Sequence, residues 1–114
     1  MPILVAEING AVVAYGTYGI FRPWDAYKFS IEHSIYVAKE EQGKGIGKEL
    51  FKELIIIAKK QGYHTMIAGI DTSNKSSIDF HKKIGFKEIG TLPEIGFKFG
   101  KWLDLCFLQL FINK

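Results

Sequence analysis

A glycine-rich stretch between a predicted strand and a predicted amphipathic helix most constrains how this chain can fold. Glycines occupy every second position of Gln42-Gly43-Lys44-Gly45-Ile46-Gly47, and apolar residues then recur at helical spacing over 46–60. The inward positions of this helix are Ile46, Leu50, Leu54, Ile57 and Ala58. Because such a junction presents bare backbone N–H groups at a helix N-terminus, the sequence predicts a site for a phosphorylated cofactor.

The segments around this helix alternate between strand and helix patterns, which predicts a mixed sheet of the α/β (α+β) class. A hairpin is expected at Asn9-Gly10, the strongest short signal for that turn. The predicted strands are 3–8, 11–18, 30–38, 65–70, 86–97 and 101–112. A second helix is predicted to begin after an N-cap within 71–74 and to end at Gly85. The strand before the glycines, the helix after them and the next strand therefore form a predicted βαβ unit.

Alternation within the third predicted strand separates its two faces. One face carries Ile31, His33, Ile35 and Val37, and the other carries Glu32, Ser34 and Tyr36. Glu32 is then a carboxylate in the middle of a strand that leads to the glycines.

Composition narrows the class of protein. A chain of 114 residues with 47% hydrophobic content supports one core, so 1–114 is expected to be a single domain. Lysines and arginines are dispersed among acidic residues, giving a net charge of +3 without the basic stripe of a nucleic-acid-binding protein. The lone cysteine, Cys106, excludes an internal disulfide, and no stretch resembles a membrane span or signal peptide, so a cytoplasmic protein without membrane contact is expected.

Two phosphate-binding patterns do not fit the glycines. A Walker A loop requires four residues between its first glycine and the Gly-Lys pair, followed by Ser or Thr. Here three residues separate Gly43 from Gly47, and Glu49 stands in place of the hydroxyl. The dinucleotide fingerprint requires its third glycine one position later than Gly47.

The same residues match the Gln/Arg-x-x-Gly-x-Gly/Ala pattern of the GCN5-related N-acetyltransferase (GNAT) superfamily. Asn74, His81 and Gly85-Phe86 stand at the offsets of that superfamily's second helix, with His where Tyr is usual. Gly62-Tyr63-His64-Thr65-Met66-Ile67-Ala68-Gly69-Ile70 and Gly96-Phe97-Lys98-Phe99-Gly100-Lys101-Trp102-Leu103-Asp104 resemble the phosphinothricin acetyltransferase branch, where His is the usual residue. The resemblance extends from Val5-Ala6-Glu7 to Gln109-Leu110.

The resemblance implies acetyl-coenzyme A (acetyl-CoA) as co-substrate, no metal, and direct acetyl transfer to the amine of a small amino-acid-like acceptor. Glu32 would be the general base if it lies buried beside the sheet, with a solvated strand glutamate as the alternative. His81 would protonate the thiolate, with a helix histidine that faces the pantetheine or the core as the alternative. The implied cofactor residues are Tyr36, Val37, Gln42, Gly43, Lys44, Gly45, Ile46, Gly47, Lys48, Asn74 and Ser77. The implied acceptor residues are Trp24, Tyr27, Phe97 and Lys98, for which dimer contacts are the alternative.

Members of the family begin with a strand and two helices that this chain lacks, so an N-terminally truncated form of the fold is expected. A second function stays open on that ground: a non-catalytic fragment that binds CoA or a partner chain without turnover. The predicted strands are too many for two short helices to cover both faces of the sheet. This exposed sheet surface and the apolar run 105–108 predict a homodimer.

Overall fold

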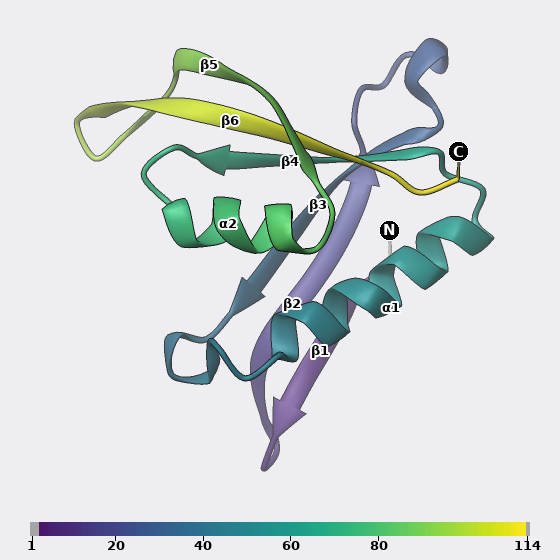
Figure 1. Cartoon of the computed structure of the whole chain (residues 1–114), viewed down its shortest axis with the longest axis vertical. Helices are drawn as coiled ribbons and strands as arrows, with labels where there is room; N and C mark the ends of the chain where they lie inside the picture. Colours follow the sequence, from purple (N-terminus) through teal and green to yellow (C-terminus); the bar gives the residue numbers. More distant parts are fainter. Residues whose placement is uncertain (1–2, 114) are drawn as a thin grey trace. The chain divides into compact units, whose positions relative to one another are not determined.

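A computed structural model of the chain describes residues 3–113, and these form the mixed α/β sheet with helices that the sequence predicts (Figure 1). The elements are β1 Ile3–Ile8, β2 Ala11–Ile20, β3 Ser30–Val37, α1 Ile46–Lys60, β4 Thr65–Asp71, α2 Lys75–Lys83, β5 Lys87–Lys98 and β6 Lys101–Phe111. Single turns of 3-10 helix, η1 Asp25–Tyr27 and η2 Lys39–Glu41, precede β3 and α1. The strand order in the six-stranded sheet is β1-β2-β3-β4-β6-β5.

The chain divides into two compact units, and each is described by itself. The first contains the chain up to Met66 together with Phe111 and the residues after it, and the second contains Ile67–Leu110. The expectation of a single domain over 1–114 stays a prediction.

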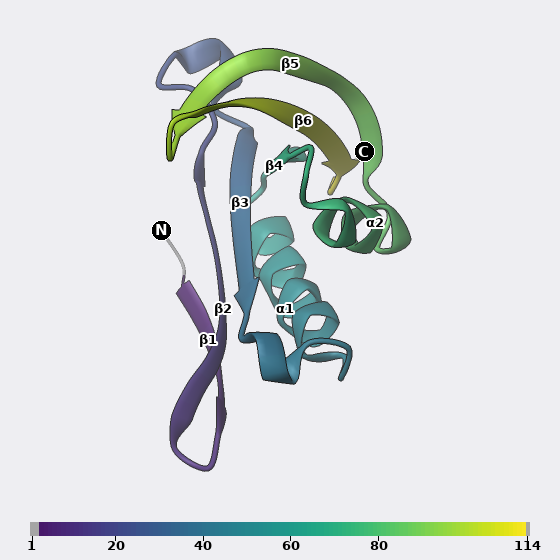
Figure 2. The ribbon, with the colours of Figure 1, turned by 90° about the vertical axis from the view of Figure 1, so that its left-hand side faces the viewer.

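The first unit is an antiparallel arrangement of β1, β2 and β3 with α1 packed on one face (Figure 2). Asn9 and Gly10 turn between the first strands with φ of 52° and 81°, as the hairpin signal predicts. Gly16 allows α1 to approach β2 closely, since a Cβ there would lie 2.7 Å from Cδ1 of Leu54. Ile31 and Leu54 are fully buried between the helix and the strands.

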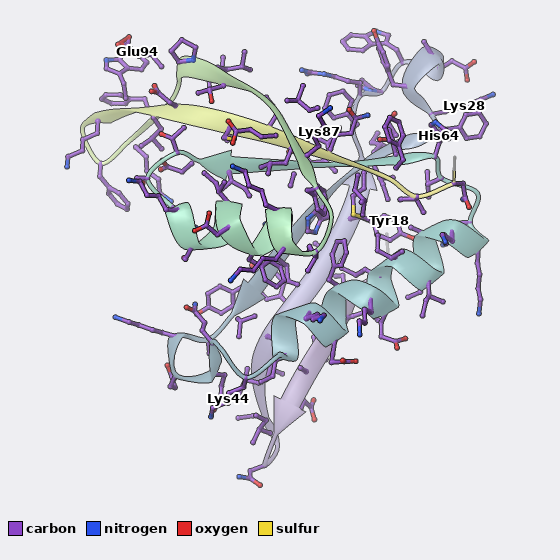
Figure 3. All side chains as sticks on the ribbon, in the orientation of Figure 1. Tyr18, Lys28, Lys44, His64, Lys87 and Glu94 are labelled. Atoms are coloured by element: carbon purple, nitrogen blue, oxygen red, sulfur yellow. The ribbon has the colours of Figure 1, made fainter. Side chains whose placement is uncertain are left out.

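The sequence prediction for α1 is confirmed at both ends. Gly45 is the N-cap and Gln61 the C-cap. The Gln61 side-chain carbonyl accepts a hydrogen bond from the hydroxyl of Tyr18, a residue labelled in Figure 3. Phe51 is also buried in this helix, although the predicted apolar stripe does not include it. Its ring meets His33 edge-on at 5.6 Å, so the apolar stripe of α1 is wider than the predicted one.

The opposite face of β1, β2 and β3 carries exposed apolar side chains. Val5, Tyr15 and Tyr36 form one row across the strands, and the two tyrosine rings stack with centroids 5.6 Å apart. Figure 2 shows α1 on the other side of these strands, and within the described residues of this unit no helix covers the row. An apolar sheet face of this kind is a candidate contact surface.

The second unit is built from most of β4, α2 and the β5–β6 hairpin. Asn74 caps α2, and the hairpin closes at Phe99 and Gly100, which have φ of 53° and 73°. Cys106 and Leu108 of β6 are buried at 2% and 0% exposure. Leu105 and Phe107, which alternate with them, are half-buried, so the run 105–108 has one interior face, and the predicted homodimer stays a prediction.

No helix within residues 3–113 has the length and apolar character required to cross a lipid bilayer.

Candidate active site

The loop between β3 and α1 has the backbone geometry of an anion site. Gly43 and Gly45 both adopt φ of 83°, in the left-handed region that favours glycine. A Cβ at either position would meet no atom within 4 Å, so the space above the loop is open. Ile46, Gly47 and Lys48 then begin α1, where backbone N–H groups have no partner within the helix. These donors and the positive end of the helix dipole favour a negatively charged group.

Two side-chain interactions brace this loop. The Gln42 side-chain amide donates to the Val37 carbonyl oxygen at 3.1 Å, which joins the loop to the end of β3. The Lys44 ammonium lies 3.0 Å from a carboxylate oxygen of Glu41. Neither contact follows from the glycine pattern, although the spacing of Glu41 and Lys44 by three residues is a signal for such a pair.

Val37 directs its backbone groups away from β2. Tyr36 pairs with Tyr15 and Val37 with Ala14, while the Ala38 N–H donates to the Val13 oxygen at 2.7 Å. In an antiparallel ladder the backbone N–H and C=O groups of successive residues point alternately toward the partner strand and away from it. The Val37 N–H and carbonyl therefore point away from β2. The bond from Gln42 to the Val37 carbonyl agrees with this direction.

Glu32 lies on the face of β3 opposite α1, together with Ser34 and Tyr36, as alternation predicts. It pairs with Gly19 of β2, and its side chain is exposed. Within residues 3–113 no element of its own unit covers that face, so the environment of Glu32 is that of the solvated strand glutamate, and its role as general base stays a prediction.

The remaining cofactor candidates belong to the second unit. Asn74 is the N-cap of α2, and its side-chain oxygen accepts from the Ser77 N–H at 3.3 Å and the Ser76 hydroxyl at 3.2 Å. This structural role leaves the Asn74 side-chain NH2 as the group with which it would meet a ligand.

His81 is buried at 3% exposure, with rings of Phe80 and Phe86 edge-on at 5.4 and 5.1 Å. Its Nδ1 lies 2.7 Å from the Ser77 carbonyl oxygen, which assigns the Nδ1–H as donor because a carbonyl only accepts. Burial lowers the pKa of His81 below its ordinary value, and the hydrogen bond to Ser77 acts in the opposite direction. The neutral imidazole is therefore favoured near neutral pH.

The acceptor candidates fall into separate groups. Trp24 and Tyr27 line an open concavity of about 610 Å³ in the first unit, together with Phe21 and Arg22. Arg22 was not among the predicted acceptor residues, although its position between Phe21 and Trp24 in the sequence was a usable signal. The guanidinium of Arg22 lies 5.1 Å from the centre of the Phe21 ring.

In the second unit, Phe97 packs against Trp102 at 4.9 Å, and the Lys98 ammonium lies 5.2 Å from the Phe99 ring. Both candidates of the hairpin, Phe97 and Lys98, are exposed.

The predicted site residues thus divide between the units. Glu32, Val37 and the loop 42–48 belong to the first, and β3 and its following turn bring Val37 and the loop together. Asn74, Ser77 and His81 belong to the second, where they share the α2 region.

The part of the chain that the structure describes contains no group of three or more His, Cys, Asp or Glu side chains arranged to hold a metal ion. Cys106 is buried, and this burial raises the pKa of its thiol. A protonated interior thiol fits a packing role.

The chain is thus an α/β protein with a mixed sheet, in which a glycine loop leads from a strand end into a helix N-terminus with the backbone geometry of an anion site. Residues 1–86 match the model of the acetyltransferase (GNAT) family, and the chain belongs to that family.

Relatives and solved structures agree with this assignment. The chain is 43% identical to an L-methionine sulfoximine/L-methionine sulfone acetyltransferase of Salmonella typhimurium, over 99% of this chain and 66% of the relative. An N-acetyltransferase structure from Staphylococcus aureus Mu50 matches with a TM-score of 0.93 and 52% identity, over 98% of this chain and 68% of that one. A phosphinothricin acetyltransferase from Sinorhizobium meliloti, solved in complex with acetyl-CoA, matches with a TM-score of 0.89 and 42% identity, over 98% and 61%.

The chain thus spans just under two thirds of the length of the curated relative, at 66%.

Proposed function

We propose that this protein binds acetyl-CoA and transfers the acetyl group directly to the amine of a small amino-acid-like acceptor of the phosphinothricin or methionine sulfoximine type. The observation that carries the proposal is the loop with left-handed Gly43 and Gly45 ahead of α1. It presents consecutive backbone donors to open space, as a pyrophosphate requires. The family membership and the acetyl-CoA in a 42% identical structure support this choice of ligand.

In this proposal the cofactor lies along the end of β3. Backbone N–H groups of the loop and of Ile46–Lys48 hold the pyrophosphate, and the Asn74 side-chain NH2 donates to the pantetheine arm. The Val37 N–H, which points away from β2, donates to the thioester carbonyl oxygen and stabilises its negative charge in the tetrahedral intermediate. The remaining cofactor contacts are assigned to Tyr36 and Ser77.

The chemistry requires the nitrogen to lose two protons and the thiolate to gain one. Glu32 accepts the first proton from the acceptor ammonium, directly or through water, and the neutral nitrogen then attacks the thioester carbon. The nitrogen of the tetrahedral intermediate loses its second proton to water. As the C–S bond breaks, the thiolate takes a proton from the protonated His81, whose lowered pKa makes this transfer favourable but reduces the protonated fraction of the imidazole. Trp24, Tyr27, Phe97 and Lys98 are the proposed acceptor contacts.

A thiol-release assay with a panel of amino-acid acceptors tests turnover, and calorimetry with acetyl-CoA tests binding. The expected result is saturable binding, which Gly45→Trp abolishes because an indole would fill the space above the loop. Absence of acetyl-CoA binding by the parent chain, or unimpaired binding by Gly45→Trp, contradicts the proposal.

A non-catalytic role is the second candidate function. The exposed row of Val5, Tyr15 and Tyr36 favours it, because such a face suits a partner chain. Under this alternative the chain binds acetyl-CoA but releases no thiol with any acceptor. Measurable turnover by the 114-residue chain excludes it.

We further propose a cytoplasmic homodimer. Exposed apolar side chains on the β1–β3 face and on the β5–β6 hairpin support the dimer, and one buried free cysteine agrees with a reducing compartment. A monomer in sedimentation at high protein concentration contradicts the dimer.

A further inference from the structure

A carboxylate and a cation of the cofactor loop are paired with each other. The Lys44 ammonium lies 3.0 Å from Glu41, and Figure 3 shows Lys44 projecting from the loop before α1. The two side chains differ in environment, since Glu41 is 16% exposed and Lys44 is 59% exposed. The carboxylate is therefore the more enclosed and better positioned member of the pair.

The backbone holds Glu41 in place. Its N–H donates to the Ala38 oxygen at 2.8 Å, which closes the η2 turn, and the adjacent Gln42 is tied to Val37. These bonds fix the backbone of Glu41 beside the loop, and the low exposure of its side chain limits how far the carboxylate moves from Lys44. An anion that reaches the Lys44 ammonium must therefore compete with a nearby carboxylate.

The charges of the pair determine how Glu41 changes the affinity of the loop for a pyrophosphate. A carboxylate at 3.0 Å compensates part of the ammonium charge, so Lys44 attracts a pyrophosphate less than an unpaired lysine would. The same carboxylate repels the pyrophosphate itself. Both effects weaken binding, and both are screened by salt.

We propose that Glu41 is a positioning residue that holds Lys44 away from the pyrophosphate, weakens the affinity of the loop for CoA, and speeds release of the free coenzyme after transfer. The inference rests on the proposed function, because it concerns the same cofactor site. It assigns to the loop a residue that sets affinity without touching the ligand.

Glu41→Gln keeps the shape of the side chain and removes its charge. The matched control is Glu40→Gln, which removes one charge from the same turn at an exposed residue. Calorimetry with CoA and stopped-flow dissociation are run over a range of salt concentrations, with thermal unfolding as the check that each variant is folded. Glu41→Ala is the second variant if Glu41→Gln folds poorly.

We expect Glu41→Gln to bind CoA about threefold to tenfold more tightly, mainly through slower dissociation, with the control within about twofold of the parent. Its affinity falls more steeply with salt, which a purely structural change would not produce. Affinity for pantetheine, which lacks the pyrophosphate, is unchanged. In a Lys44→Met background the gain shrinks to that of the Glu40 control.

Equal or weaker CoA binding by Glu41→Gln, or an equal gain for pantetheine, overturns the inference while leaving the proposed function intact. A parent chain that binds no CoA at all overturns the proposed function, and with it the inference.

Discussion

Gly45 and Gly62 flank α1 in the same backbone conformation, with φ of +83° and +84°, and a Cβ at either would meet no atom within 4 Å. Substituting each by alanine therefore introduces the same conformational cost without a steric clash. An L residue in the left-handed region costs about 1–2 kcal/mol. Part of this is offset by the smaller entropy of the unfolded chain, so we expect each variant to lose about 1 kcal/mol of unfolding free energy. The melting temperature then falls by about 4 °C for a chain of this size.

The two variants differ in their effect on acetyl-CoA. Gly45 is the N-cap, so an alanine that relaxes toward negative φ reorients the first N–H groups of α1. A hydrogen bond to a charged group contributes about 1.5–3 kcal/mol, so loss of one weakens binding by about 10-fold to 100-fold. Gly62 lies beyond the other end of the helix, and Gly62→Ala is expected to bind acetyl-CoA like the parent.

Denaturant unfolding and calorimetry on the same preparations measure both quantities. Equal losses of affinity in the two variants would mean that a general loss of stability weakens binding. Local reorientation of the first N–H groups of α1 would then not explain the weaker binding. Unchanged affinity in Gly45→Ala would refute that explanation equally.

Glu32→Gln should lower kcat by about 10²-fold to 10⁴-fold and leave acetyl-CoA affinity unchanged, since a general base acts on the acceptor; a parent-like kcat in steady-state assays excludes that role. Gly16→Ala should cost about 1–3 kcal/mol because its Cβ would lie 2.7 Å from Cδ1 of Leu54. Denaturant titrations should show a smaller cost in a Leu54→Ala background, and additive losses would count against the contact. Burial lowers the pKa of His81 in the folded protein below the value of 6.5. The neutral imidazole therefore contributes its full share of the unfolding free energy above pH 6.5, and this share is lost as pH falls toward the folded-state pKa. His81→Phe should reduce the loss of unfolding free energy as pH falls below about 6.5, and an unchanged dependence on pH would assign that loss to other groups.

Periodicity predicted most of the fold. The alternation in β3 correctly separated buried Ile31 and His33 from exposed Glu32, because strand side chains alternate whatever the rest of the chain does. Phe51 was missed, since the three strands beneath α1 accommodate a wider stripe than the helical pattern used for prediction. The sequence left open whether Glu32 is buried or solvated, because this depends on which elements cover its face of the strand.

The cofactor loop could be found from sequence because glycine spacing encodes a backbone conformation. Gly43 and Gly45 both adopt the left-handed backbone geometry, which glycine reaches far more readily than other residue types. The roles of Glu32 and His81 came from family resemblance and stay predictions, since proton transfer depends on distances to a ligand.

The sequence by itself therefore determined the strand faces, the limits of α1 and the open glycine loop, all of which follow from local backbone preferences. Only the tertiary structure decided which polar groups meet: Gln42 with the Val37 carbonyl, Lys44 with Glu41, and the His81 imidazole with the Ser77 carbonyl. These contacts depend on turn geometry, which sets the distances between the groups. They also depend on burial, which sets the dielectric surroundings and so the strength of charge interactions and the pKa values. For that reason the loop was predictable, while its affinity-setting ion pair was not.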